Sequence, residues 1–235
     1  MWNREKTEAV LERDALSNAG LLQVLRRGTA QMLRADENGI LLRDTVSGIC
    51  FLSESGGTAD WLGEIPGNLL MVVGSAADAD AAKTARNAAW MEPCDQYVWL
   101  GGYPGAPERL RIAEAAPEEL EIVAAHYELI SREELEQVAA RHTLFVGHDD
   151  SGSLVGFAGS HLEGAMGILE VFPAFRRKGY AAELERYVIR HFAQNGLIPF
   201  GQVTADNAAS AALQRKIGMT KAPRRAYWIG TDEMK

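Results

Sequence analysis

An apolar strand that ends at a proline and continues into three cations and a glycine constrains this chain more than any other segment. The stretch is Val171-Phe-Pro-Ala-Phe-Arg-Arg-Lys-Gly-Tyr-Ala181, and a long helical pattern follows it. The start of a helix presents unpaired backbone N–H groups and the positive end of the helix dipole. Gly179 lets the backbone approach a ligand closely, and the side chains of Arg176, Arg177 and Lys178 add full positive charges. The stretch therefore predicts a site for the pyrophosphate of a nucleotide-type cofactor.

The composition indicates a globular protein with a real core. The chain has 235 residues, of which 47% are hydrophobic and 24% charged, enough for one large domain or two small ones. Its net charge of −8 argues against general binding to nucleic acid, which favours a basic surface. No apolar run approaches the length of a membrane span, so we expect neither a nucleic-acid partner nor a membrane.

Cysteine and histidine usage bears on the compartment and on metal binding. The two cysteines, Cys50 and Cys94, lie in unrelated surroundings and suggest neither a disulfide framework nor a metal knuckle. The histidines outside the candidate site lack metal-ligand spacing, so no metal is expected. The first residues, Met-Trp-Asn-Arg-Glu-Lys, lead into a charged segment without the apolar core of a signal peptide. We expect a cytoplasmic protein.

The first half of the chain alternates strand and helix but contains no ligand motif. Turn-forming residues at Ala35–Gly39 and Asp44–Gly48 separate three short strands. The expected helices are Thr7–Gly20, Leu21–Arg27 and Ala77–Trp90, and the expected strands are Gln31–Arg34, Gly39–Arg43, Gly48–Leu52, Leu69–Val73 and Gln96–Leu100.

The segment Gly101–Pro107 is the densest in glycine and proline and predicts a boundary. We therefore expect an N-terminal α/β domain over residues 1–105 and a second domain over residues 106–235. The helices expected in the second domain are Pro117–Leu129, Ser131–Arg141, Tyr180–Gln194 and Asn207–Ile217, and its strands are Leu110–Ala113, Thr143–Val146, Leu154–Ser160, Met166–Val171, Ile198–Val203 and Arg225–Ile229.

Taken one at a time, the motif residues of this second domain have ordinary structural explanations. Arg176 to Lys178 fit a solvated charged turn. Asn207 fits a helix N-cap, and Gly218 fits the glycine that ends a helix. Their occurrence in one fixed order is what separates a binding site from these alternatives.

That order resembles the GNAT superfamily of acyl-CoA-dependent N-acyltransferases over about Leu110 to Gly230. The residues Arg176-Arg-Lys-Gly-Tyr-Ala181 fit the family's pyrophosphate signature, Arg/Gln-x-x-Gly-x-Gly/Ala. The stretch from Asn207 to Gly218 is similar to its second cofactor segment. The Ile198-Pro-Phe segment, with the Arg-Arg-Lys-Gly-Tyr start, looks closest to the branch of glycine N-acyltransferase-like proteins.

The resemblance implies a GNAT fold, an α/β (α+β) architecture with a central mixed, mostly antiparallel sheet flanked by helices. By analogy with two-domain members, the N-terminal domain is expected to be a degenerate GNAT-like half, with the acceptor site in the cleft between the halves. The alternative is a distinct small domain with a regulatory or dimerising role.

The resemblance also implies the cofactor, acetyl-CoA, and its contacts. The pantetheine arm would lie between Leu169–Phe172 and Pro199–Val203, two parallel strands that separate. One backbone amide near Leu169 or Val171 would polarise the thioester carbonyl. The implied contact residues are Leu169, Val171, Arg176, Arg177, Lys178, Gly179, Tyr180, Ala181, Asn207 and Ser210.

The catalytic groups are less defined. Gln214 stands where many members carry a proton-donating tyrosine, and Ala165 stands where others carry a glutamate base. Three residues are candidates to deprotonate an amine: His161, Glu163 and Glu170. Their structural alternatives are exposed turn residues for the first two and, for Glu170, a carboxylate paired with a neighbouring cation.

The resulting hypothesis is an enzyme, an N-acetyltransferase that moves acetyl from acetyl-CoA to a primary amine by direct attack in a ternary complex. The acceptor is expected to be a small molecule and the protein a monomer or homodimer. The alternative is an acyl-CoA-binding sensor or scaffold without turnover.

Overall fold

The computed structural model describes residues 3–36, 39–54, 56, 62, 65 and 70–231. The strands are β1 (Ala30–Ala35), β2 (Ile40–Asp44), β3 (Cys50–Leu52), β4 (Met71–Val73), β5 (Trp90–Val98), β6 (Arg111–Glu114), β7 (Leu144–His148), β8 (Leu154–Ser160), β9 (Met166–Val171), β10 (Phe200–Thr204), β11 (Thr220–Lys221) and β12 (Ala226–Gly230). The helices are α1 (Arg4–Leu11), η1 (Glu12–Asp14), α2 (Ala19–Arg27), α3 (Ala76–Arg86), α4 (Pro117–His126), α5 (Arg132–Ala140), η3 (Pro173–Phe175), α6 (Tyr180–Gln194) and α7 (Ala208–Ile217).

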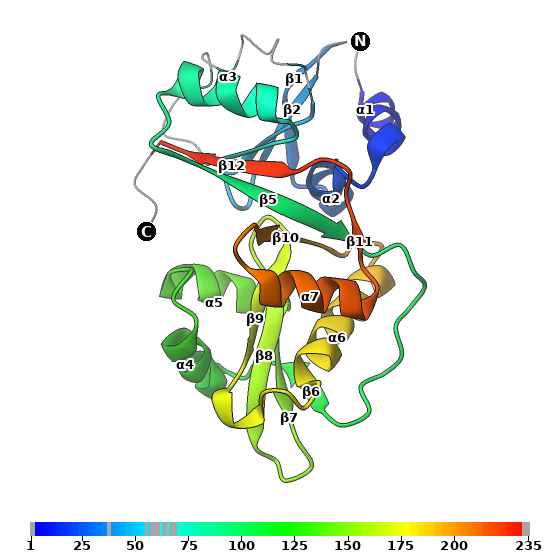
Figure 1. The fold of residues 1–235 in the computed structure, drawn as a ribbon, viewed down its shortest axis with the longest axis vertical. Helices are drawn as coiled ribbons and strands as arrows, with labels where there is room; N and C mark the ends of the chain where they lie inside the picture. The colour runs from blue at the N-terminus through cyan, green and yellow to red at the C-terminus, as the bar shows by residue number, and fades with distance from the viewer. Residues whose placement is uncertain are drawn as a thin grey trace.

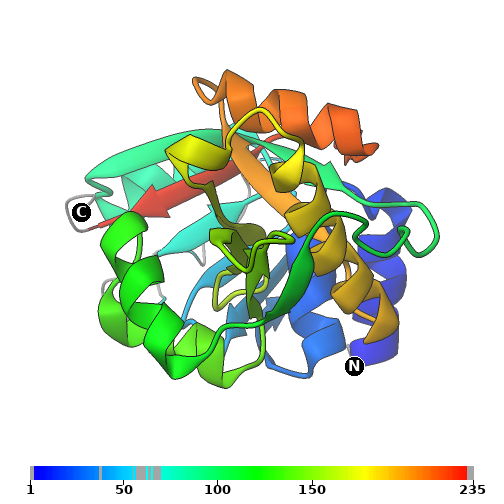
Figure 2. The ribbon, with the colours of Figure 1, turned by 90° about the horizontal axis from the view of Figure 1, so that it is seen from below.

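These strands form one mixed sheet in the order β1-β2-β3-β4-β12-β5-β10-β9-β8-β7-β6, and the short β11 pairs with β5. Among the described strands, two neighbouring pairs run parallel: β3 pairs with β4, and β9 pairs with β10. The other neighbours run antiparallel. Helices lie on both faces of the sheet, as the two orthogonal views show (Figure 1, Figure 2). The expected α/β architecture with a mixed, mostly antiparallel sheet is confirmed.

The N-terminal helix is shorter than the sequence predicts. Instead of one helix over Thr7–Gly20, α1 ends at Leu11, a 3₁₀ turn follows, and α2 begins only at Ala19. The break occurs where short polar side chains replace helical hydrogen bonds, because the Asn18 Nδ2 donates to the Leu11 carbonyl at 3.0 Å. The predicted helix was too long because the spacing of apolar residues carries no information on side chains that compete for backbone hydrogen bonds.

The boundary between α3 and β5 also differs from the sequence prediction. The helix predicted over Ala77–Trp90 ends at Arg86, because Asn87 adopts a left-handed conformation with φ of 49°. The strand predicted over Gln96–Leu100 starts at Trp90 and contains Pro93. Over residues 90–93, β5 pairs with β12 alone, and its pairing with β10 begins at Cys94. A proline is tolerated there because no second neighbour needs its missing N–H.

The second half follows the sequence prediction closely. Strands β8 and β9 and helix α6 have the predicted bounds, and α4 ends three residues before the predicted Leu129. The segment Gly101–Pro107 is irregular, as predicted. It is attached to the second half by the Arg190 side chain, which donates to the Pro104 carbonyl at 3.2 Å.

The two halves share the sheet. Strand β12, from the end of the second half, lies between β4 and β5 of the first half, and β5 pairs in turn with β10. Phe200 and Ile198 of the second half belong to the same apolar cluster as Leu22 and Phe51 of the first. The sheet and its core therefore continue across the predicted boundary at residue 105, and the division into two domains stays a prediction.

A few predicted features fall outside the described residues. These are Glu37 and Asn38 of the first predicted turn and Leu69, the predicted first residue of β4. Among the helices that the structure describes, none has both the length and the apolar character that a membrane span requires.

Gly156 of β8 offers a test of how closely β9 is held against its neighbour. A Cβ at this position would lie 2.9 Å from the Val171 Cα and would also collide with the Glu170 carbonyl. We therefore expect Gly156→Ala to lower the free energy of unfolding by about 1–3 kcal/mol, measured by urea denaturation. A Cβ at Gly105 would meet no atom within 4 Å. The matched variant Gly105→Ala should therefore change the free energy by less than about 0.5 kcal/mol, and equal losses in both variants would contradict this account.

Candidate functional site

The feature that creates the candidate site is the separation of β9 from β10. These parallel strands are paired at one position, Gly201 with Met166, and no further pair joins them along their described length. Separated strands present backbone N–H and C=O groups on their facing edges, where an extended ligand can pair like an added strand. The structure thus contains the opening predicted between Leu169–Phe172 and Pro199–Val203.

A cavity of about 410 Å³ occupies this opening, and we call it the cofactor cavity. Three of the predicted cofactor residues, Leu169, Asn207 and Ser210, line it. The other lining residues are Tyr127, Leu129, Ala158, Gly159, His161, Met166, Gly167, Ile168, Glu185, Val188, Gly201, Gln202, Val203, Thr204 and Gln214. The Asn207 Oδ1 accepts the Ser210 N–H at 3.0 Å, so Asn207 is also the N-cap of α7.

A β-bulge lies at the inner end of the opening. The register shifts between Gly159 and Ser160 of β8, whose partners in β9 are Ile168 and Met166. Gly167 is the extra residue, and a bulge leaves such a residue outside the regular ladder. Gly167 faces the His161 imidazole, since a Cβ on it would lie 2.7 Å from the His161 Nε2. The bulge thus places irregular backbone beside a titratable side chain.

The loop before α6 has the backbone conformation that suits an anion. Arg177 and Gly179 both have positive φ, 60° and 86°. Gly179 is the N-cap of α6, and no side chain caps this helix. The first N–H groups of the helix therefore remain available, and consecutive N–H groups in such a turn form an anion-binding concavity. The backbone of this loop suits an anion, and its assignment to a pyrophosphate stays a prediction.

Arg109 is a fourth cation at this loop, and the sequence analysis did not identify it. Its guanidinium donates to the Lys178 carbonyl, bonds the Glu183 carboxylate at 2.6 Å, and lies 5.5 Å from the centre of the Tyr180 ring. A Cβ on Gly179 would lie 2.7 Å from the Arg109 Nη2, so only glycine fits there without displacing this arginine. Because Arg109 is distant from the motif in sequence, only the fold reveals it.

The side chains of the predicted loop residues lie in different surroundings. Arg176 donates to the Val171 carbonyl at 2.9 Å and lies 3.5 Å from the Glu170 carboxylate. The Lys178 Nζ lies 5.3 Å from the centre of the Phe175 ring. Glu170 therefore has the cation partner that its structural alternative required, and it is not among the residues that line the cofactor cavity.

A second cavity, of about 360 Å³, adjoins the first, and we call it the acceptor cavity. It contains residues from both halves of the chain, as expected for a cleft between them. Its lining residues are Ile49, Leu70, Trp90, Glu92, Cys94, Leu129, Ile130, Glu134, His161, Glu163, Ala165, Met166, Gly167, Gln202, Thr204 and Trp228. The two cavities share Leu129, His161, Met166, Gly167, Gln202 and Thr204, so they meet around His161.

His161 lies at this junction, where its surroundings favour the neutral form of the imidazole. Its Nε2 lies 3.4 Å from the Tyr127 hydroxyl, which donates to the Gly167 carbonyl at 3.2 Å. Burial lowers the pKa of the imidazole, and the nearby Glu134 carboxylate opposes that shift. His161 is therefore mostly neutral at pH 7 and can accept a proton.

Glu163 is a buried acid in the same turn. It is only 4% exposed, and burial raises its pKa to about 7. Arg27 stabilises the charged carboxylate, whereas the carboxylate of Asp44, 3.9 Å from Arg27, opposes it. A carboxyl group with a pKa near neutrality can exchange protons at pH 7. The alternative of two freely exposed turn residues thus does not describe His161 and Glu163.

Comparison with known proteins agrees with this geometry. Residues 145–229 match the family model described as FR47-like protein, and no curated protein sequence matches the chain. A Drosophila protein of solved structure has a TM-score of 0.63 at 18% identity, covering 99% of this chain and 88% of its own. A GCN5-related N-acetyltransferase from Kribbella flavida has a TM-score of 0.57 at 13% identity, over 96% of this chain and 95% of its own.

A GNAT-family acetyltransferase from Colwellia psychrerythraea has a TM-score of 0.54 at 15% identity, over 99% of this chain and 98% of its own. The chain has the GNAT fold. The resemblance on which the sequence analysis relied is therefore confirmed, while the narrower placement near glycine N-acyltransferase-like proteins stays a prediction. The degenerate GNAT-like character of the N-terminal half stays a prediction as well.

Within this GNAT fold, a buried pair in the cofactor cavity was missed by the sequence analysis. The Gln214 Nε2 donates to the Glu185 Oε1 at 2.5 Å, and both side chains are 6% exposed. The Glu185 Oε2 and the Gln214 Oε1 have no hydrogen-bond partner among the described residues. Burial raises the pKa of Glu185 to about 7. The only sequence signal was a charged residue on the apolar face of α6.

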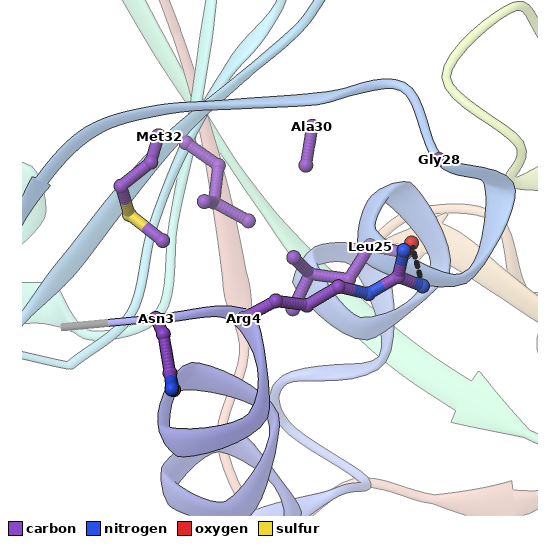
Figure 3. Close-up of a pocket in the computed structure, with 7 residues that line it drawn as sticks. Asn3, Arg4, Leu25, Gly28, Ala30 and Met32 are labelled. Atoms are coloured by element: carbon purple, nitrogen blue, oxygen red, sulfur yellow. Dashed lines mark hydrogen bonds between the residues drawn. The ribbon is translucent and has the colours of Figure 1, made fainter.

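Two other hollows lie away from the junction of the cavities. One, of about 180 Å³, lies between α1 and β1, where Arg4 donates to the Leu25 carbonyl at 2.8 Å (Figure 3). This arginine satisfies a carbonyl at the end of α2 and is structural. The other lies between the Gly101–Pro107 segment and α6. No group of three or more His, Cys, Asp or Glu side chains suited to a metal ion occurs within the described residues.

The raised pKa of Glu163 predicts a pH-dependent stability. In the unfolded chain a glutamate ionises near its ordinary pKa of about 4.3, so between pH 5 and 7 the folded state binds more protons than the unfolded state. Stability therefore falls as the pH rises through this window. Glu163→Gln removes the effect, and its free energy of unfolding should gain on the order of 3 kcal/mol relative to wild type between pH 5 and pH 8.

Urea denaturation at both pH values measures this difference. The exposed Glu133 serves as the matched control, and Glu133→Gln should track the wild type across the range. A Glu163→Gln variant with no relative gain at pH 8 would show that the buried carboxyl group is not protonated in the folded state.

Proposed function

We propose that this protein is an N-acetyltransferase that transfers an acetyl group from acetyl-CoA to a primary amine in a ternary complex. The observation that carries the proposal is the meeting of two cavities at His161, one in the opening between β9 and β10 and one between the halves of the chain. A ligand in each cavity would be adjacent to the other at this residue, and such proximity is the main requirement of a direct transfer.

The first cavity and the loop before α6, which does not line that cavity, together fit acetyl-CoA. The Arg177–Gly179 turn and the uncapped start of α6 suit a pyrophosphate, with the Arg109 guanidinium beside them. The bulge at Gly167 supplies irregular backbone that can polarise a carbonyl. The orphan oxygens of Glu185 and Gln214 provide polar partners for an amide-bearing arm. Leu169, Asn207 and Ser210 would complete the walls of the cofactor cavity around this arm.

When bound, acetyl-CoA would supply an activated acetyl group. In the transfer, a bond forms between the amine nitrogen and the acetyl carbon, and the bond between that carbon and the sulfur breaks. One proton leaves the amine, and one proton reaches the sulfur. Within the chain, His161 is the first candidate to take the amine proton, because its imidazole is at the junction and favours the neutral form. Glu163 lines the acceptor cavity and can accept a proton from the same side.

Glu185 is the residue that we propose to provide a proton on the cofactor side. Its Oε1 is occupied by Gln214, so a proton on the carboxyl group resides on the Oε2, which has no partner among the described residues. Gln214 itself cannot act as an acid. The carboxyl group of Glu185 would thus take the role that a tyrosine fills in many GNAT members.

The pyrophosphate loop gives the first test. We expect the double variant Arg177→Ala with Lys178→Ala to weaken CoA binding by about 10–100-fold, and wild-type affinity to fall as salt is added. Isothermal titration calorimetry at two salt concentrations measures both effects. Arg13→Ala with Lys83→Ala also removes two exposed cations and is the control. Undiminished affinity in the loop variant would overturn the pyrophosphate assignment.

The role of Glu185 gives the second test. Glu185→Gln keeps the shape of the side chain and its bond to Gln214 but cannot donate an acidic proton. We expect kcat for thiol release to fall by about 10²–10⁴-fold, with CoA affinity retained. The fall of kcat above about pH 7 that loss of the acidic proton causes should disappear, whereas the pH dependence due to His161 and Glu163 should remain. A higher KM for acetyl-CoA with unchanged kcat would instead assign Glu185 to binding.

The wild-type protein tests the proposed function as a whole. If it binds CoA but releases no thiol with any amine, the alternative of a non-catalytic acyl-CoA sensor is favoured.

A further inference from the structure

The acceptor cavity has a charge pattern that restricts its ligand. Three carboxyl side chains, of Glu92, Glu134 and Glu163, line it, and none of its described lining residues is lysine or arginine. None of these three carboxylates forms an ion pair with another described residue. Arg27 acts electrostatically on Glu163 but does not line the cavity, so carboxylates outnumber cations around it and favour a positively charged ligand.

The carboxylates fall into two groups at different places. Glu134 and Glu163 interact electrostatically with each other, and Glu134 also interacts with His161, so this group is at the junction with the cofactor cavity. Glu92 comes from β5 of the first half. The reacting amine must be neutral when it attacks, so the acids beside His161 serve to hold and deprotonate it. Glu92 is not part of this group, so it is available to bind a second positive group of the same ligand.

The surroundings of Glu92 suit an organic cation. Trp228 of β12 is directly opposite Glu92, and Trp90 is two residues earlier in β5, on the same face. All three side chains are partly buried and line the cavity. An ammonium beside a carboxylate and two indole rings is stabilised by charge and by cation–π attraction. Five further residues that line the cavity are apolar: Ile49, Leu70, Leu129, Ile130 and Met166.

We infer that the acceptor is an aliphatic amine with a second cationic group, whose distal ammonium binds at Glu92 between Trp90 and Trp228 while the other nitrogen is acetylated at His161. The inference rests on the proposed acetyl transfer. A cavity of about 360 Å³ is of the size that holds a small molecule. An amino acid of similar length would bring its carboxylate against Glu92 and is disfavoured.

Three amines of the same chain length test this inference: cadaverine, pentylamine and δ-aminovalerate. They share one primary amine and differ at the far end, which carries an ammonium, a methyl group or a carboxylate. We expect kcat/KM for thiol release from acetyl-CoA to be about tenfold higher for cadaverine than for pentylamine, and lowest for δ-aminovalerate. Glu92→Gln should reduce the ratio of cadaverine to pentylamine toward one, whereas the exposed-site control Glu133→Gln should keep it.

A binding measurement without acetyl-CoA separates this inference from the proposed function. Cadaverine alone should raise the Tm of the wild type more than pentylamine does, and Glu92→Gln should abolish the difference. Equal turnover of the three amines would overturn the inference and leave the acetyltransferase intact. The Tm difference with cadaverine, but no thiol release with any amine, would support the amine site and overturn the proposed function. Absence of both the Tm difference and the turnover preference would overturn the diamine assignment.

Discussion

The single pairing of Gly201 with Met166 is the constraint on which the rest of this structure depends. A parallel pair normally continues for several residues, and here it stops at once, so the facing edges of β9 and β10 stay open. The open edges create the cofactor cavity, and the bulge at Gly167 is at its inner end. The opening therefore offers unpaired backbone N–H and C=O groups to water or to an extended ligand.

The two faces of the sheet have different chemistry at this opening. Helices α6 and α7 contribute the buried pair of Gln214 and Glu185, whose pKa is raised to about 7, together with the uncapped start of α6. Strands β5 and β12, helix α5 and the turn at His161 contribute carboxylates and indoles. Under the proposed function, one side would hold the phosphate-bearing ligand and the other the cationic amine. His161 lines both cavities, and the groups packed against its ring, among them Tyr127 and Gly167, bury it enough to lower its pKa.

Local chemistry made much of the second half predictable from sequence. Residues Tyr180 to Gln194 have a clear apolar face and a helix stop, and Gly179 marks a loop that no other residue type fits. The missed elements depend on partners far away in the chain. Strand β5 starts early because β12 pairs with its first part, and Pro93 is tolerated there because β10 pairs with β5 only from Cys94 onward. Arg109 and Glu185 were missed because their roles come from residues roughly seventy and thirty positions away. Neither is part of a local pattern.

The position of β12 has a consequence for the unity of the molecule. Its residues, Ala226–Gly230, follow every other strand in sequence but fill the space between β4 and β5. Separating the chain at the Gly101–Pro107 segment would leave the N-terminal fragment with three unpaired strand edges, one on β4 and both on β5. In the C-terminal fragment, β12 would lose both of its neighbours. The halves are thus interlocked by their connectivity. Neither is a module that evolution can exchange without rebuilding the sheet of the other.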